Sequence, residues 1–312
     1  MARTPLQPLA LFANTGADVR AKLEIRQPTG SFKIRGAFNA VLRLMEEHGD
    51  ARPKVVTASA GNHGRGMAFA AKEAGIPLTV YVPETAPHAK IDPIRASGAE
   101  LRPCPDYDEA ERAAKEHGAR GEALFISPYS HPDVIAGAAT VGLEIIEDWP
   151  DVDIIVVPIG GGGLISGIAL AAREVKPTVQ VIGVEVEASS PFTRGLAVGH
   201  IVTIDVQPTL ADGLSGNLDP DTVTFDIVRE HVSQIAVVTE EELRTAIVAL
   251  ATREGLTVEP AGAVGVAALL AGKIDIAGKR VALVLSGGNI DADKLRRLTE
   301  LSINSRKLPT DD

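Results

Sequence analysis

Short apolar runs alternate with stretches in which apolar residues recur every three or four positions along almost the whole chain. The runs are typical of buried strands, and the wider spacing is typical of amphipathic helices. This alternation predicts an α/β protein with mostly parallel sheets flanked by helices. The expected strands cover residues 54–58, 78–82, 123–126, 154–157, 179–184, 235–238 and 281–285. The expected helices include residues 64–74, 133–148, 240–253 and 260–270.

Another helix is expected near the start of the chain, where apolar residues recur from Ile34 until Gly49 ends the pattern. Ser31 is the expected N-cap, which places Lys33 in the first turn. The positive end of the helix dipole and the neighbouring Phe32 both favour the neutral amine of Lys33. A neutral lysine is a nucleophile and a base. On the helix pattern alone, an ordinary surface lysine is the favoured interpretation of Lys33.

Four consecutive glycines, Gly160 to Gly163, follow the expected strand at 154–157 and precede a helix over 164–175. Such a turn can present several backbone amides to an anion at a helix N-terminus. Four glycines carry an entropic cost that a plain turn does not require, so phosphate binding is favoured over a simple loop.

A dinucleotide fingerprint is the alternative interpretation of the same loop. Gly161, Gly163 and Ser166 approach its spacing, and Glu185 stands where a ribose-binding acid is expected. That interpretation predicts an NAD-dependent oxidoreductase. The final position of the fingerprint is serine rather than glycine or alanine, and no Walker lysine follows the loop.

Composition narrows the function classes. A chain of 312 residues is long enough for two lobes. The formal net charge of −10 argues against nucleic acid or an anionic membrane as a partner. Cys104 is the only cysteine, so neither an internal disulfide nor a thiolate metal cluster is expected. No apolar leader or membrane-spanning stretch is recognised, and a cytoplasmic location is the expectation.

A lysine able to form a Schiff base, together with a phosphate cradle, points to pyridoxal phosphate. Several motifs in a fixed order support this: Thr-Gly-Ser-Phe-Lys-Ile-Arg-Gly-Ala at 29–37, Ser-Ala-Gly-Asn-His-Gly at 59–64, Val-Ile-Ala-Gly at 134–137, the glycine loop, Ala-Asp-Gly at 211–213, Glu-Pro at 259–260 and Ser-Gly-Gly-Asn at 286–289. With these motifs the chain resembles, over nearly its whole length, the threonine and serine dehydratases and serine racemases, which form the β-family of pyridoxal-phosphate enzymes.

The resemblance implies two lobes with the cofactor in the cleft between them. Residues 1–53 and 133–312 would form the large lobe, and residues 54–132 the small lobe inserted in it. The residues expected to bind the cofactor are Phe32, Lys33, Asn62, Gly160, Gly161, Gly162, Gly163, Leu164, Glu259 and Ser286. A neutral hydroxyl at Ser286, facing the ring nitrogen, would suit elimination of a β-substituent. Taken alone, Ser286 is a common type of serine at the end of a strand.

The resemblance assigns the loop at 59–64 to the substrate carboxylate. The residues expected to bind substrate are Ser59, Ala60, Gly61, Asn62, His63 and Tyr129, and the expected catalytic residues are Lys33 and Ser59. A turn tyrosine at the surface is an equal alternative for Tyr129. His63 and His131 are more typical of structural or solvated histidines, and Asp212 of a turn aspartate. Arg65 departs from the pattern, because these enzymes usually carry glutamine there.

The activity implied by the resemblance is dehydration and deamination of a small hydroxy amino acid. L-Threonine is the first choice and L-serine the second. A serine racemase and a 3-hydroxyaspartate dehydratase are the alternatives within the family, although Ala60 replaces the serine that racemases use as a second proton carrier. A cation site is not expected, because Pro191 stands where relatives that bind a cation near Glu185 and Ser189 carry an acid. Relatives form homodimers or homotetramers.

Overall fold

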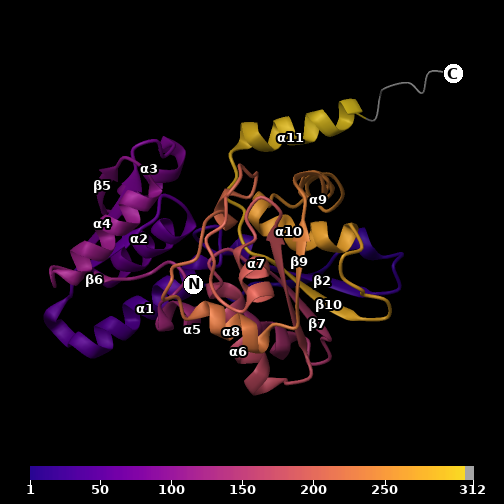
Figure 1. Ribbon diagram of the computed structural model, residues 1–312, viewed down its shortest axis with the longest axis horizontal. Helices are drawn as coiled ribbons and strands as arrows, with labels where there is room; N and C mark the ends of the chain where they lie inside the picture. The colour runs from indigo at the N-terminus through magenta and orange to yellow at the C-terminus, as the bar shows by residue number, and fades with distance from the viewer. Residues whose placement is uncertain (306–312) are drawn as a thin grey trace.

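Two sheets organise the computed structural model, which describes residues 1–305 (Figure 1). The larger sheet has the strand order β1-β2-β10-β7-β8-β9, in which β1 is antiparallel to β2 and the other neighbours are parallel. Its strands are β1 (Leu6–Pro8), β2 (Asp18–Leu23), β7 (Ile154–Pro158), β8 (Gln180–Val186), β9 (Gln234–Val238) and β10 (Arg280–Leu285). The smaller sheet, in the order β5-β4-β3-β6, is parallel throughout. Its strands are β3 (Val55–Ala58), β4 (Leu78–Pro83), β5 (Glu100–Cys104) and β6 (Leu124–Phe125).

Helices cover both sheets, as the fold prediction required. They are α1 (Lys33–His48), α2 (Asn62–Ala74), α3 (His88–Ala96), α4 (Tyr107–Ala119), α5 (Pro132–Asp148), α6 (Gly163–Val175), α7 (Pro191–Val198), α8 (Thr224–His231), α9 (Glu240–Arg253), α10 (Pro260–Leu270) and α11 (Ala292–Ser305). Short 3-10 turns, among them η2 (Glu24–Arg26) and η4 (Asp212–Leu214), join some of them. Among the described helices, none is both long and apolar enough to cross a bilayer.

The larger sheet is buried on both faces. Leu283 and Leu285 of β10 belong to one apolar cluster with α9 and α10, whereas Ala282 and Val284 belong to another with α5 and α6. Alternate residues of a strand point to opposite faces, so an all-apolar strand can serve two cores. This explains why the central strands are continuous apolar runs, and Figure 1 shows the two helical layers on either side.

The smaller sheet has its own cores. One face packs against α2, α3 and the apolar side of α1, and the other packs Val56 and Ala58 against Ala110 and Ala114 of α4. In Figure 1 these elements lie together at the left, in indigo and purple. Helix α1 contacts α2 and α5 alike, so it connects the smaller sheet to the rest of the molecule. The lobe boundaries at residues 53/54 and 132/133 stay a prediction.

Three strands were absent from the sequence prediction: the edge strand β1, which has only three residues, and two longer strands. In β2 the polar Arg20 and Lys22 alternate with apolar residues, yet Lys22 is fully buried, and its amine pairs with Glu144 at 2.7 Å. A charged residue in a central strand hides the apolar run on which strand prediction relies. The other strand, β5, lies at the edge of its sheet and contains Pro103, which is tolerated there because an edge position needs fewer ladder donors.

The N-cap prediction for the first helix was wrong. Helix α1 begins at Lys33, as expected, but Phe32 occupies the cap position with helical backbone angles and no side-chain cap. Ser31 instead forms a β-bridge with Gly287, and the Phe32 amide donates to the carbonyl of Ser286 at 2.9 Å. These backbone contacts tie the start of α1 to the end of β10, so a serine cap is not needed.

Candidate active site

The loops that carry the predicted site residues follow the carboxyl ends of parallel strands in both sheets. Ser59 follows β3, Gly160 follows β7, and Ser286 follows β10 directly. Open α/β sheets bind ligands at this edge, where helix N-termini and loop amides converge. Helix α1 begins at the same edge, which brings Lys33 to these loops.

Lys33 is partly buried, and its Nζ donates a hydrogen bond to the carbonyl oxygen of Pro128 at 2.7 Å. The centre of the Phe32 ring lies 5.1 Å from Nζ. Burial lowers the pKa of the Lys33 amine to about 8, although the negative charge of Glu259 opposes this shift. Lys33 therefore carries a sizeable neutral fraction near physiological pH, as a carbonyl nucleophile or a base requires.

The glycine loop is packed tightly by its neighbours. A Cβ on Gly161 would lie 2.3 Å from the ring of Tyr129, and one on Gly162 would lie 2.6 Å from the ring of Phe192. Gly162 also has a φ of +87°, a conformation that other residues adopt only with strain. The loop thus needs glycine for packing as well as for any ligand, a reason that the sequence does not reveal.

Helix α6 begins within this loop, at Gly163, with no side-chain cap and no acidic residue in its first turn. The first amides of a helix have no partner within it, so they remain available to an anion. Leu164 contributes such an amide while its side chain is buried in the core. Ser166 adds a buried hydroxyl without a partner among the described residues. The loop therefore fits a phosphate group.

Asn62 is the first residue of α2, Glu259 is the cap residue of α10, and their side chains are in contact. The Asn62 side-chain amide donates to Oε1 of Glu259 at 2.7 Å. Burial raises the pKa of Glu259 to about 7, although the bond from Asn62 lowers it. A Cβ on Gly287 would lie 2.3 Å from Glu259 Oε1, so the loop after Ser286 presses on this pair. Asn62 and Glu259 are therefore in direct contact, and Gly287, the residue after Ser286, lies against both.

The residues of the loop at 59–64 lie at the N-terminus of α2. Gly61 is the cap residue, and its amide donates to Ser59 Oγ at 3.2 Å. Ser59, Ala60 and Gly61 are partly exposed, and α2 has no acidic residue in its first turn. His63 differs, because its ring is buried and its Nε2 lies 3.1 Å from Thr57 Oγ1. Burial holds the pKa of His63 well below its usual range, so the ring is neutral.

Tyr129 lies over the glycine loop, with its hydroxyl turned away from it. The hydroxyl oxygen accepts a hydrogen bond from the Asp219 amide at 3.1 Å, and burial raises the pKa of the phenol. His131 is the N-cap of α5 and accepts from the Asp133 amide, which agrees with the structural interpretation of that histidine. The substrate role predicted for Tyr129 stays a prediction.

Glu185 is committed to a structural task. Its fully buried carboxylate accepts from the amides of Phe192 and Thr193, each at 2.9 Å, and from the Thr193 hydroxyl at 2.6 Å. The carboxylate therefore caps the N-terminus of α7. The oxidoreductase interpretation required Glu185 to bind a ribose, but its carboxylate is already occupied by these hydrogen bonds. Within the described part of the chain, no group of three or more histidine, cysteine, aspartate or glutamate side chains could hold a metal ion.

Several contacts at the site were not anticipated from the sequence. The Pro128 carbonyl that binds Lys33 comes from the turn at 127–132, where the sequence indicated Tyr129 and His131 but not Pro128. Two ion pairs also join helices of the smaller sheet to loops beyond β8: Lys90 of α3 pairs with Asp212, and Lys115 of α4 pairs with Asp219 at 2.5 Å. The Ala-Asp-Gly motif indicated Asp212, but no sequence signal indicated its partner.

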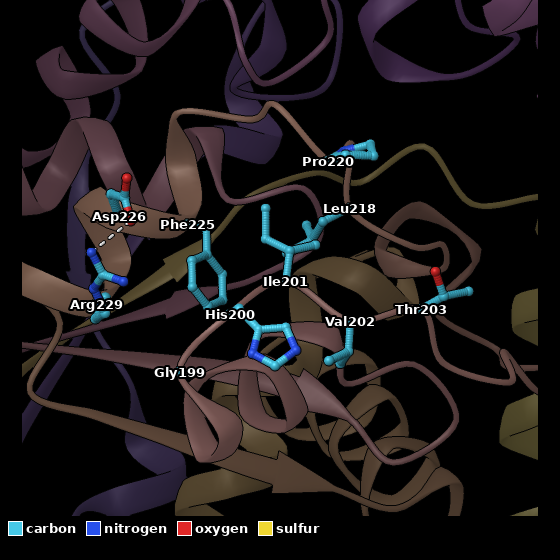
Figure 2. Close-up of a pocket in the computed structure, with 10 residues that line it drawn as sticks. All are labelled: Gly199, His200, Ile201, Val202, Thr203, Leu218, Pro220, Phe225, Asp226 and Arg229. Carbon is cyan, nitrogen blue, oxygen red and sulfur yellow. Dashed lines mark ion pairs between the residues drawn. The ribbon is translucent and has the colours of Figure 1, made fainter.

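A separate cavity of about 410 Å³ lies beside α8, away from these residues (Figure 2). Its lining includes His200, Ile201, Phe225 and the ion-paired Asp226 and Arg229, and none of the predicted site residues. The Phe225 ring, which lines the cavity, stacks on Phe192 with a centroid distance of 6.1 Å. Phe192 in turn lies against Gly162, so the cavity is on the Phe192 side of the glycine loop and not at Lys33.

Comparisons with known proteins agree with this geometry. The L-threonine ammonia-lyase of Thermotoga maritima is 45% identical over 285 residues, which cover 91% of this chain and 70% of that protein. The catabolic L-threonine dehydratase TdcB of Escherichia coli is 41% identical over 285 residues, 90% of this chain and 86% of that one. The structure of maize serine racemase matches 98% of this chain and 94% of its own, with a TM-score of 0.87 and 32% identity.

The family model described as pyridoxal-phosphate dependent enzyme matches residues 1–287. Its cofactor agrees with the site, where an amine of lowered pKa lies beside an uncapped, glycine-lined helix N-terminus. Lys33 would hold the cofactor carbonyl, the loop at 160–163 its phosphate, and Asn62 and Ser286 its ring. The alternation of strands and helices, the buried lysine and the matched motifs lead to one conclusion: this chain belongs to the family of pyridoxal-phosphate dependent enzymes.

Proposed function

We propose that the protein eliminates water from a small hydroxy amino acid, and that hydrolysis of the resulting enamine, which consumes one water molecule, releases a 2-oxo acid and ammonia. L-Threonine, which would give 2-oxobutanoate, is the first substrate, and L-serine, which would give pyruvate, is the second. One observation carries this proposal: the Lys33 amine, of lowered pKa, lies in a site shared by the glycine loop and Ser286. The relative named L-threonine ammonia-lyase supports the choice of substrate.

Each residue has a task that follows from its surroundings. Pyridoxal phosphate, when bound, withdraws electrons from the α-carbon of an amino acid and so acidifies its proton. The neutral Lys33 amine accepts that proton, because burial keeps its pKa near the working pH. The amides at the N-terminus of α2, with Ser59, bind the substrate carboxylate at an end of the helix that carries no acid. The Phe32 ring excludes water from Lys33.

Ser286 favours elimination over chemistry that needs a stronger electron sink. Its side chain is neutral and buried directly after β10. An aspartate at this position would keep the ring nitrogen protonated, whereas a hydroxyl does not. Loss of a β-hydroxyl needs less delocalisation of charge, so this arrangement suits a dehydratase.

Racemisation is the second candidate activity, favoured by the likeness to maize serine racemase. It needs a proton carrier on the face opposite Lys33, and Ala60 offers only a methyl group there. A 3-hydroxyaspartate substrate would need a cation for its second carboxylate. Lys90 and Lys115, which lie on helices of the smaller sheet, are each paired with an aspartate, which favours an uncharged β-substituent.

The test is the release of 2-oxo acid from L-threonine, L-serine and L-threo-3-hydroxyaspartate by the purified protein. Turnover should be fastest with L-threonine, and borohydride reduction should add the mass of the cofactor to the peptide that contains Lys33. A colourless protein that stays unmodified by borohydride would refute the mechanism. Fastest turnover with the dicarboxylate would refute the choice of substrate.

The assembly and location also belong to this proposal. The protein is expected to act in the cytoplasm as a homodimer or homotetramer. Sedimentation velocity would measure the assembly, and a purely monomeric species at micromolar concentration would contradict it.

A further inference from the structure

Four side chains form one continuous chain of hydrogen bonds from Arg65 of α2 to Glu259, the cap residue of α10. Arg65 of α2 donates from Nη1 to Asn289 Oδ1 at 2.7 Å. The Asn289 amide donates to Asn62 Oδ1 at 2.7 Å, and the Asn62 amide donates to Glu259 Oε1 at 2.7 Å. This hydrogen-bond chain begins at Arg65, the residue at which the sequence departs from the motif of related dehydratases, which usually carry glutamine there.

The two ends of this chain determine its direction. A guanidinium group can only donate, which by itself orients the chain, and Glu259 in its ionised form can only accept. Asn289 must therefore turn Oδ1 toward Arg65 and its amino group toward Asn62, where it also donates to the carbonyl of Thr29 at 2.9 Å. Asn62 must in turn direct its amino group at Glu259. A glutamine at position 65 could accept as well as donate, and it would permit the reverse order.

Packing restricts the movement of the side chains in this hydrogen-bond chain. A Cβ on Gly30 would lie 2.5 Å from Asn289 Oδ1, and a Cβ on Gly287 would lie 2.3 Å from Glu259 Oε1 and 3.2 Å from Asn62 Nδ2. The backbone therefore lies against three of the four side chains. Each side chain can change its hydrogen bonds by exchanging its two ends but not by moving away.

We infer that Arg65 is a positioning residue that holds Asn62 as a hydrogen-bond donor toward the cofactor ring and keeps Glu259 as the acceptor at the end of the chain. This inference rests on the proposed function for the role of Asn62. The Asn62 amino group has two hydrogens, and its bond to Glu259 uses one. The other can be donated to a ring oxygen. With the order reversed, Asn62 would present its own oxygen to that position.

The charges around Glu259 also support this role of Arg65. Glu259 faces positive groups from three helices, namely Lys33 of α1, Arg65 of α2 and Lys90 of α3, and one further acid, Asp212 of η4. Burial lowers the pKa of Arg65, which shows that its charge is only partly solvated and therefore poorly screened. Its removal should make ionisation of Glu259 harder.

The experiment compares the cofactor-loaded protein with its Arg65→Gln, Arg65→Lys and Lys72→Gln variants. Lys72 is an exposed cation on the same helix and controls for a simple loss of charge. Carbon-13 NMR of labelled glutamate carboxyls follows the titration of Glu259, assigned by the signal that Glu259→Gln removes. A second measurement is the cofactor dissociation constant from equilibrium dialysis, together with the visible absorption band of the bound cofactor.

Arg65→Gln should raise the pKa of Glu259 by about half a pH unit or more. The same variant should weaken cofactor binding about threefold to tenfold, the effect of one misdirected hydrogen bond. Arg65→Lys keeps a donor cation and should stay close to the unmodified protein in both measurements, as should Lys72→Gln. An unchanged titration in Arg65→Gln, or equal effects of glutamine and lysine, would overturn the inference. If the unmodified protein bound no cofactor, the proposed function would fail while the carboxyl titration still decided the role of Arg65.

Discussion

The amine of Lys33 and the carbonyl oxygen of Pro128 lie 2.7 Å apart and join the start of α1 to the turn after β6. The next residue of that turn, Tyr129, packs its ring on Gly161. One short segment therefore contacts both the reactive amine and the glycine loop. This places the nucleophile beside the anion site without any direct bond between the two.

Replacing Lys33 by alanine should abolish turnover while some cofactor binding remains. The amine supplies the covalent attachment and the proton transfer, and the glycine loop supplies much of the affinity for phosphate. The loss in 2-oxo acid release should be about 10²-fold to 10⁴-fold or greater. Lys72→Ala, at an exposed site on α2, is the matched control and should remain fully active. Near-normal turnover by Lys33→Ala would remove the central assignment.

Replacing Gly162 by aspartate should abolish cofactor retention. The new carboxylate would occupy the anion site and repel the phosphate. Gly162 also has positive φ, so any side chain there adds strain of about 1–2 kcal/mol. Gly162→Ala shares this strain but carries no charge, and it should retain measurable cofactor after dialysis. Equal loss in both variants would mean that packing against Phe192, rather than charge, explains the effect.

Loading of cofactor-free protein should accelerate as the pH rises through about 8, because only the neutral Lys33 amine attacks a carbonyl. Glu259 raises the pKa of this amine, so Glu259→Gln should move the midpoint lower, by about half a pH unit. Stopped-flow absorbance at several pH values would measure both midpoints. A midpoint near 10 would show that Lys33 is not desolvated, and an upward movement in Glu259→Gln would contradict the assigned sign.

Ala60 should limit the protein to elimination. A methyl group neither donates nor accepts a proton, so reprotonation can occur only from the side of Lys33. Ala60→Ser should raise the formation of D-serine from L-serine at least about tenfold, while elimination continues. Chiral chromatography of the products measures both. Abundant D-serine from the unmodified protein would favour a racemase, and no increase in the variant would show that a hydroxyl at position 60 does not reach the substrate.

The layered α/β architecture could be predicted from the amino-acid order, because continuous apolar runs and helical patterns with a period near 3.6 are local features. The bounds of α9 and α10 agree with those patterns residue for residue. The motifs also named a lysine, an asparagine, a glycine loop and a serine that the fold does bring to one edge of the sheets. Their order along the chain carried that information before any contact was known.

Only the tertiary structure decided how these groups act on one another. Burial sets the pKa of Lys33 and Glu259, and burial depends on residues far away in the chain. The strand with Lys22 could not be recognised, because its charge is balanced by Glu144 of a distant helix. Glu185 had the spacing of a ribose ligand, yet it caps α7. The direction of the chain from Arg65 to Glu259 likewise exists only where residues distant in sequence meet, because hydrogen-bond geometry belongs to the folded arrangement and not to the order of residues.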